Sequence, residues 1–228
     1  VAKTEIYGCD TFVGREGEIE QIADAYRRGV RAVVLCGMGG IGKSELARHF
    51  AMRYNGKNVA AVQLVSLPDT FLPPKSIDSQ LFSVLSAVEY VPSVTARMEG
   101  KSERERLDIM CGALRNLPPH ALIILDNVNF PYRGLLRRLL SFTKCLFLLT
   151  SRVVEEPVSA NPAEAEQSGL DRRAARLKEK MQRLDDAQFA VLPEVTKLPP
   201  AEAQELFVRE SGRAVSGPEF YGLYRLVD

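Results

Sequence analysis

Short apolar runs alternate along the chain with stretches in which apolar residues recur at helical spacing. Unbroken apolar runs are typical of strands that are buried on both faces, and the alternation of strands with helices indicates a mainly parallel sheet. The predicted strands are residues 32–36, 59–65, 121–125 and 145–149. The predicted helices are residues 14–28, 44–54, 77–88, 102–115, 201–210 and 218–227. Ser102 and Glu105 form a capping-box pattern at the start of one of them.

Residues 157–186 differ from the rest of the chain because they are rich in charge. Their apolar residues recur at spacings of four and three, which predicts an amphipathic helix. Such a helix could pack on the core of the domain or bind a partner, and the pattern leaves both roles open.

Composition narrows the class of protein without fixing it. The 228 residues carry a formal net charge of +1, which gives no field that would favour nucleic acid or an anionic membrane. No apolar run is long enough to span a bilayer, and no signal peptide precedes the first strand. The four cysteines are scattered and form no metal-binding pattern, so we expect a reduced, cytoplasmic protein. Because the chain starts at Val1, we expect it to be an internal piece of a longer protein.

The first strand runs into a glycine-rich loop that matches the phosphate-binding pattern G-x-x-x-x-G-K-[ST]. Glycines let such a loop wrap its N–H groups around phosphates, and the following helix adds its positive end. We expect Lys43 to reach the β- and γ-phosphates of a nucleotide, and the Ser44 hydroxyl to bind Mg²⁺. The residues predicted to contact nucleotide here are Gly37, Met38, Gly39, Gly40, Ile41, Gly42, Lys43, Ser44 and Glu45.

Two further positions lie at the ends of predicted strands, where an open α/β sheet binds its ligands. Asp126 ends the strand at 121–125, and we expect it to support Mg²⁺ as a Walker B acid. The next residue, Asn127, cannot act as a base but can hold a water, which favours slow hydrolysis. Arg152 follows the strand at 145–149, and it is either a surface arginine or a contact for the γ-phosphate.

Together these motifs resemble the NB-ARC domain of the AP-ATPase branch of the STAND signalling ATPases. Phe12-Val13-Gly14-Arg15-Glu16 is similar to the segment that lies over the adenine in that family, so the resemblance implies this role for Phe12, Val13, Gly14 and Arg15. The loop at 37–44 is nearly the family's own form. Thr150-Ser151-Arg152 resembles its sensor strand, which implies that Arg152 senses the γ-phosphate.

The resemblance implies an α/β fold of the P-loop NTPase (ASCE) type, a three-layer sandwich followed by the start of a small helical domain. Residues 1–198 would form the nucleotide-binding domain, with a helical insertion at about 157–186, and residues 199–228 the truncated beginning of a helical lid. The implied function is an ATP/ADP switch with Mg²⁺. Its partners would be the sensor and effector domains of the parent chain. Release by the sensor would permit the ATP state, which would self-associate and activate the effector.

Several departures keep other functions open. The family's G-x-P motif, which packs on the adenine, is not found in place, because Gly217-Pro218 comes too early. Asn127 stands where the family often has an acid. The alternatives are an AAA+ motor or loader acting on DNA or protein, a nucleotide-locked scaffold that never hydrolyses, and a small-molecule kinase, for which no catalytic base stands out. No membrane partner is expected, and nucleic acid is not a favoured one.

Overall fold

The computed structural model describes residue 1 and residues 6–54, 62–68, 76–153 and 188–226. The predicted helix at 157–186 lies outside the described residues. The elements in chain order are α1 (Glu16–Arg27), β1 (Ala32–Cys36), α2 (Lys43–Tyr54), β2 (Val62–Ser66), α3 (Ile77–Ser86), α4 (Pro92–Met98), α5 (Glu103–Arg115), β3 (Leu122–Asp126), α6 (Arg133–Phe142), β4 (Leu146–Ser151), β5 (Phe189–Val191), α9 (Pro200–Ser211) and α10 (Gly217–Leu226).

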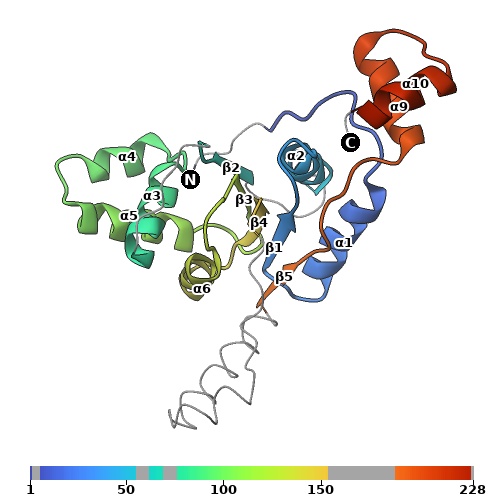
Figure 1. The fold of residues 1–228 in the computed structure, drawn as a ribbon. Helices are drawn as coiled ribbons and strands as arrows, with labels where there is room; N and C mark the ends of the chain where they lie inside the picture. The colour runs from blue at the N-terminus through green and yellow to red at the C-terminus, as the bar shows by residue number, and fades with distance from the viewer. Residues whose placement is uncertain (2–5, 55–61, 69–75, 154–187, 227–228) are drawn as a thin grey trace, which may run out of the picture.

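The strands form one sheet in the order β2-β3-β4-β1-β5, and every recorded pairing between neighbours is parallel. Figure 1 shows α1 and α2 on one side of this sheet and α6 on the other. The α/β fold with a mainly parallel sheet is therefore confirmed. Because β4 lies between β1 and β3, the strand before the glycine loop does not pair with the strand that ends in Asp126.

The central strands β1, β3 and β4 are buried at every position, as their unbroken apolar runs predicted. Alternate residues serve opposite faces, which follows from the two-residue period of a strand. In β1, Val33 and Leu35 pack towards α1 and α2, whereas Ala32, Val34 and Cys36 pack towards α3, α5 and α6. The two apolar layers hold the sheet rigid and leave the polar ends of the strands as the place for chemistry.

The helix boundaries follow local signals where these are strong. The predicted capping box is confirmed, since the Ser102 hydroxyl accepts from the Glu105 N–H and the Glu105 side chain accepts from the Ser102 N–H. Pro200 stands in the first turn of α9, and Gly212 ends that helix with a φ of 65°. The α9–α10 pair packs through Phe207 and Phe220 and lies beyond the sheet in Figure 1.

Three elements were not predicted from the sequence: α4, α6 and β5. For α6 a signal was present, because Leu135, Leu136, Leu139 and Leu140 are all buried and recur at helical spacing. The strand β5 has only three residues, too few for a pattern, and it exists because it pairs with Ala32–Val34 of β1. The strand β4 extends beyond the predicted residue 149 through Thr150 and Ser151.

Candidate nucleotide-binding site

The loop between β1 and α2 adopts a conformation that depends on glycine. Gly37, Gly40 and Gly42 have φ values of 146°, 78° and 96°, which side chains disfavour. At Gly37 there is also no room, since a Cβ atom would lie 2.7 Å from the Val195 carbonyl oxygen. The glycines of the predicted pattern are thus required by the backbone path, which turns from the end of β1 directly into α2.

Lys43 is buried at the first position of α2, with 8% of its surface exposed. Its Nζ donates hydrogen bonds to the carbonyl oxygens of Gly37 and Met38, each 2.7 Å away. Burial, and then the positive charge of Arg152, lower the pKa of the Lys43 ammonium group. The lysine therefore lies along the concave side of its own loop, where a charge-assisted contact with phosphate would offset its desolvation.

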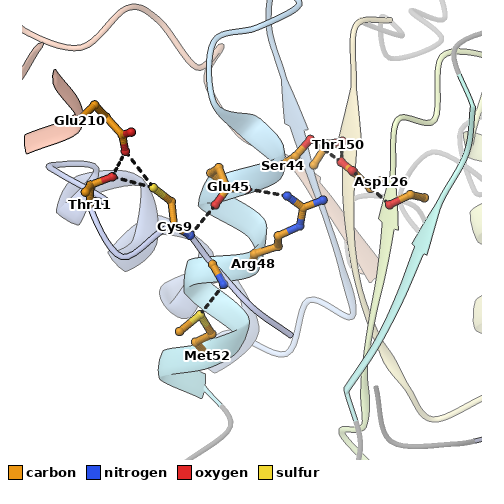
Figure 2. Close-up of polar contacts among 11 residues, drawn as sticks. Cys9, Thr11, Ser44, Glu45, Arg48, Met52, Asp126, Thr150 and Glu210 are labelled. Atoms are coloured by element: carbon orange, nitrogen blue, oxygen red, sulfur yellow. Dashed lines mark hydrogen bonds and ion pairs between the residues drawn. The ribbon is translucent and has the colours of Figure 1, made fainter. Parts of the chain in front are cut away.

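Asp126 accepts hydrogen bonds from hydroxyl groups of three elements (Figure 2). The hydroxyls of Ser44 and Thr150 lie 2.7 Å and 2.6 Å from its Oδ1, and that of Ser66 lies 3.4 Å from its Oδ2. Asp126 is only 6% exposed. Its carboxylate therefore joins the start of α2 to the ends of β2 and β4.

The pairing of Ser44 with Asp126 provides the oxygen donors that Mg²⁺ prefers. Within the described residues, no group of three or more His, Cys, Asp or Glu side chains could hold a metal ion. The hydroxyl of Ser44 and the carboxylate of Asp126 fit an ion bound partly through water and partly through nucleotide phosphates. When bound, Mg²⁺ would neutralise negative charge on those phosphates.

A cavity of about 220 Å³ opens at this edge of the sheet. It brings together residues predicted from the glycine loop, from α2 and from the end of β4. It is also lined by Asn129, which sequence reasoning missed, although two asparagines spaced by one residue after a strand could have drawn attention to it. The lining residues are Gly39, Gly40, Gly42, Lys43, Ser44, Glu45, Asn127, Asn129, Thr150, Ser151 and Arg152.

Arg152 lies over the glycine loop. A Cβ atom at Gly39 would lie 3.3 Å from the Arg152 Nε, so the guanidinium group is close to the loop backbone. The backbone N–H of Arg152 donates to the side-chain oxygen of Asn129, 2.9 Å away. The structure thus places this arginine beside the phosphate loop and not on an unrelated surface.

Other predicted residues do not line the cavity. Met38 is largely exposed, and Phe12 stacks on His49 of α2 with ring centroids 4.0 Å apart. Arg15 is buried, pairs with Glu18, and donates to the Ile41 carbonyl oxygen 3.2 Å away, which ties its segment to the glycine loop. Val13, Gly14, Gly37 and Ile41 are likewise absent from the lining.

Two residues have partners that the sequence did not indicate. Glu45 accepts a hydrogen bond from the Cys9 N–H at 2.9 Å and pairs with Arg48 (Figure 2). Asn127, which we expected to be able to hold a water, lines the cavity; its Nδ2 donates to the Leu67 carbonyl oxygen 2.8 Å away, and its Oδ1 accepts from the Asn129 side chain. Each end of this amide therefore makes one hydrogen bond to protein.

Comparison with known proteins agrees with this geometry. The sequence profile of the AAA ATPase domain matches residues 11–210. The chain belongs to the AAA ATPase domain family. Membership of this family implies binding of a nucleotide and usually of Mg²⁺.

Two solved structures are similar to the chain at low sequence identity, and the first of them shows the same fold. A Walker-type ATPase of Pyrococcus abyssi is 16% identical with a TM-score of 0.50, and the alignment covers 94% of this chain and 63% of that one. The Cdc6p protein of Pyrobaculum aerophilum is 11% identical with a TM-score of 0.46, covering 90% of this chain and 52% of that one. This AAA ATPase domain thus spans less than two thirds of the length of either protein. No curated protein sequence matches the chain.

The described part of the chain contains no helix with the length and apolar character that crossing a membrane requires.

Replacing Asp126 with Asn is expected to weaken ATP binding about tenfold or more when Mg²⁺ is present, because the carboxylate charge next to Ser44 is lost. In excess chelator the two proteins should bind ATP alike. Titration calorimetry with and without Mg²⁺ measures both affinities, and Asp108→Asn on the exposed face of α5 is the matched control. An unchanged magnesium dependence in Asp126→Asn would contradict the metal role.

The burial of the His49 ring, on which Phe12 stacks, predicts a pH dependence of stability. Both ring nitrogens of His49 are buried and make no hydrogen bond among the described residues. Burial, and then the charge of Arg53, lower the pKa of His49 from its ordinary value of 6.5. The unfolded chain therefore binds this proton more readily, so the free energy of unfolding falls as the pH drops below about 6.5 towards the lower pKa of the folded state.

Urea denaturation between about pH 8 and about pH 5 should show this fall, and His49→Phe should remove it while keeping the ring stack. The exposed His120, changed to Asn, provides the control and should leave the pH dependence in place. A pH profile that is the same in His49→Phe and in the parent protein would refute the assignment.

Proposed function

We propose that this AAA ATPase domain is an ATP/ADP switch with slow Mg²⁺-dependent hydrolysis, of the kind found in the NB-ARC and STAND signalling ATPases. The observation that carries the proposal is the position of Lys43, Ser44 and Arg152 around one cavity, with Asp126 bonded to Ser44. A cation over the glycine loop gives ATP a contact that ADP cannot make. Only such differential contact lets a nucleotide shift a conformational equilibrium.

Contacts between the lid helix α9 and the core supply an element for such a switch to act on. Glu210 of α9 accepts hydrogen bonds from Thr11 and from the Cys9 thiol, and the Cys9 N–H donates to Glu45, the neighbour of Ser44 (Figure 2). At Gly14, a Cβ atom would collide with the Glu202 carboxylate of the same helix. The segment before α1 therefore connects the lid to the helix that begins at the phosphates.

Slow turnover is supported by the residue that follows Asp126. Asn127 cannot accept a proton, and its amide is bonded to Leu67 and Asn129. A site without a base next to its Walker B acid suits a switch that must remain in one nucleotide state for a long time.

The domain limits and partners proposed for this switch follow from the same resemblance. Residues 1–198 would form the nucleotide-binding domain, and residues 199–228 the start of a helical lid. The ATP state, reached after a sensor domain of the parent protein releases the lock, would expose a surface for self-association and activate an attached effector domain.

A motor or loader ATPase is a second candidate, because the AAA ATPase profile covers the chain from residue 11 to residue 210. Such proteins turn over steadily and are stimulated by the macromolecule on which they act. The switch and the motor or loader therefore differ in the rate of ATP hydrolysis and in its stimulation by a macromolecule.

Changing Arg152 to Ala should weaken ATP binding about tenfold to a hundredfold and leave ADP binding unchanged, because a charge-assisted contact to the γ-phosphate is lost. Lys43→Ala should abolish binding of both nucleotides. Calorimetry gives each dissociation constant, and Arg138→Ala on the exposed side of α6 controls for loss of one positive charge. If the ratio of the dissociation constants for ATP and ADP were unchanged in Arg152→Ala, Arg152 would have no sensing role.

Steady-state hydrolysis by the purified chain should be slow, below about one turnover per second, and should not respond to duplex DNA. Phosphate release measured with and without DNA tests this directly. Rapid hydrolysis that rises severalfold with DNA would favour the loader over the switch.

A further inference from the structure

The loops that follow β2, β3 and β4 are joined by two side-chain amides. Asn127, after β3, donates through Nδ2 to the carbonyl oxygen of Leu67, just after β2, over 2.8 Å. Asn129 donates through its own Nδ2 to the Asn127 Oδ1. The Asn129 Oδ1 then accepts from the backbone N–H of Arg152, just after β4, over 2.9 Å. Neighbouring strands of the sheet are thus linked at the edge where the cavity opens.

The orientation of both amides is fixed by their outer partners. A backbone carbonyl only accepts, so Asn127 must point its NH₂ group at Leu67 and its oxygen at Asn129. A backbone N–H only donates, so Asn129 must point its oxygen at Arg152 and its NH₂ group at Asn127. The central bond therefore has a donor facing an acceptor, and reversing either amide would break two bonds.

The backbone around Asn127 is held from the other side as well. Asn127 has a φ of 65°, a left-handed conformation that asparagine tolerates better than most residues. Its N–H donates to the Thr150 Oγ1 over 2.9 Å, and that hydroxyl donates to Asp126 over 2.6 Å. The Val128 N–H also donates to the Thr150 carbonyl oxygen over 2.9 Å. The asparagine turn is thereby braced against the end of β4.

We infer that Asn127 and Asn129 are positioning residues for Arg152. They hold the Arg152 backbone in the position from which its side chain lies over Gly39. Because both are uncharged amides, they add no charge that would compete with the protein's own groups for phosphate or Mg²⁺. The inference rests on the proposed function, in which Arg152 contacts the γ-phosphate. It gives the Asn127 amide, which faces Leu67 and Asn129, a second role beside the water-holding one expected from the sequence.

Substituting Asn129 with Ala tests the inference. The dissociation constant for ATP should rise about fivefold to tenfold while that for ADP stays the same, since only the γ-phosphate contact loses its support. The double variant Asn129→Ala/Arg152→Ala should bind ATP no more weakly than Arg152→Ala alone, because the two residues act through one contact. Asn116→Ala, an exposed asparagine before β3, is the matched control. Should Asn129→Ala fail to fold, Asn129→Ser removes the same bridge while leaving a polar group.

A second measurement separates this inference from the proposed function. Hydrogen exchange at the Arg152 amide, followed without nucleotide, should accelerate severalfold in Asn129→Ala, because its acceptor is gone. One outcome is that exchange accelerates in Asn129→Ala while Arg152→Ala leaves the ratio of the dissociation constants for ATP and ADP unchanged. In that case the sensing function fails, and the positioning of Arg152 by Asn129 stands. Another outcome is that Arg152→Ala lowers the affinity for ATP relative to ADP, while Asn129→Ala changes neither this relative affinity nor hydrogen exchange at the Arg152 amide. That outcome overturns the positioning role. Equal weakening of ATP and ADP by Asn129→Ala would also overturn it.

Discussion

The site depends on the parallel register of the sheet. Parallel strands bring their carboxyl ends to one edge, and here those ends carry the glycine loop after β1, Asp126 on β3, and Thr150 on β4. The carboxylate of Asp126 would be costly to bury at this edge without partners, and the hydroxyls of Ser44 and Thr150 provide them. Because β4 lies between β1 and β3, Thr150 at its end is next to the acid, and Ser44 reaches the same carboxylate from the helix that follows β1.

Sequence patterns predicted the parts of the fold that obey local rules. Continuous apolar runs identified the strands, and the glycine loop was recognisable because its backbone path permits little else at Gly37. Asp126 was predicted because an apolar run that ends in an acid has a known place beside such a loop. These predictions concern which residues lie at the site, and their roles in binding remain proposals that the experiments above address.

The rest could not be predicted because it depends on contacts between distant segments. Asn129 belongs to the site only because Arg152, far along the chain, offers it a backbone N–H. Glu45 was expected to contact nucleotide, yet its carboxylate also bonds to Cys9 in the segment before α1. The strand β5 has no pattern of its own and forms because β1 presents an unpaired side. Contacts of this kind can be identified only from the three-dimensional structure, because the sheet determines which distant segments lie together.

The shortness of β5 has a consequence for association between copies of the chain. In the sheet that the described residues form, β5 lies at an edge, where unpaired backbone groups can take a further strand. It offers only Phe189–Val191 before Pro193, which has no N–H to donate. This edge of the sheet is therefore a poor template for strand addition and for the aggregation that such addition starts. The self-association proposed for the ATP state would therefore use side-chain surfaces, whose fit depends on the positions of helices and loops.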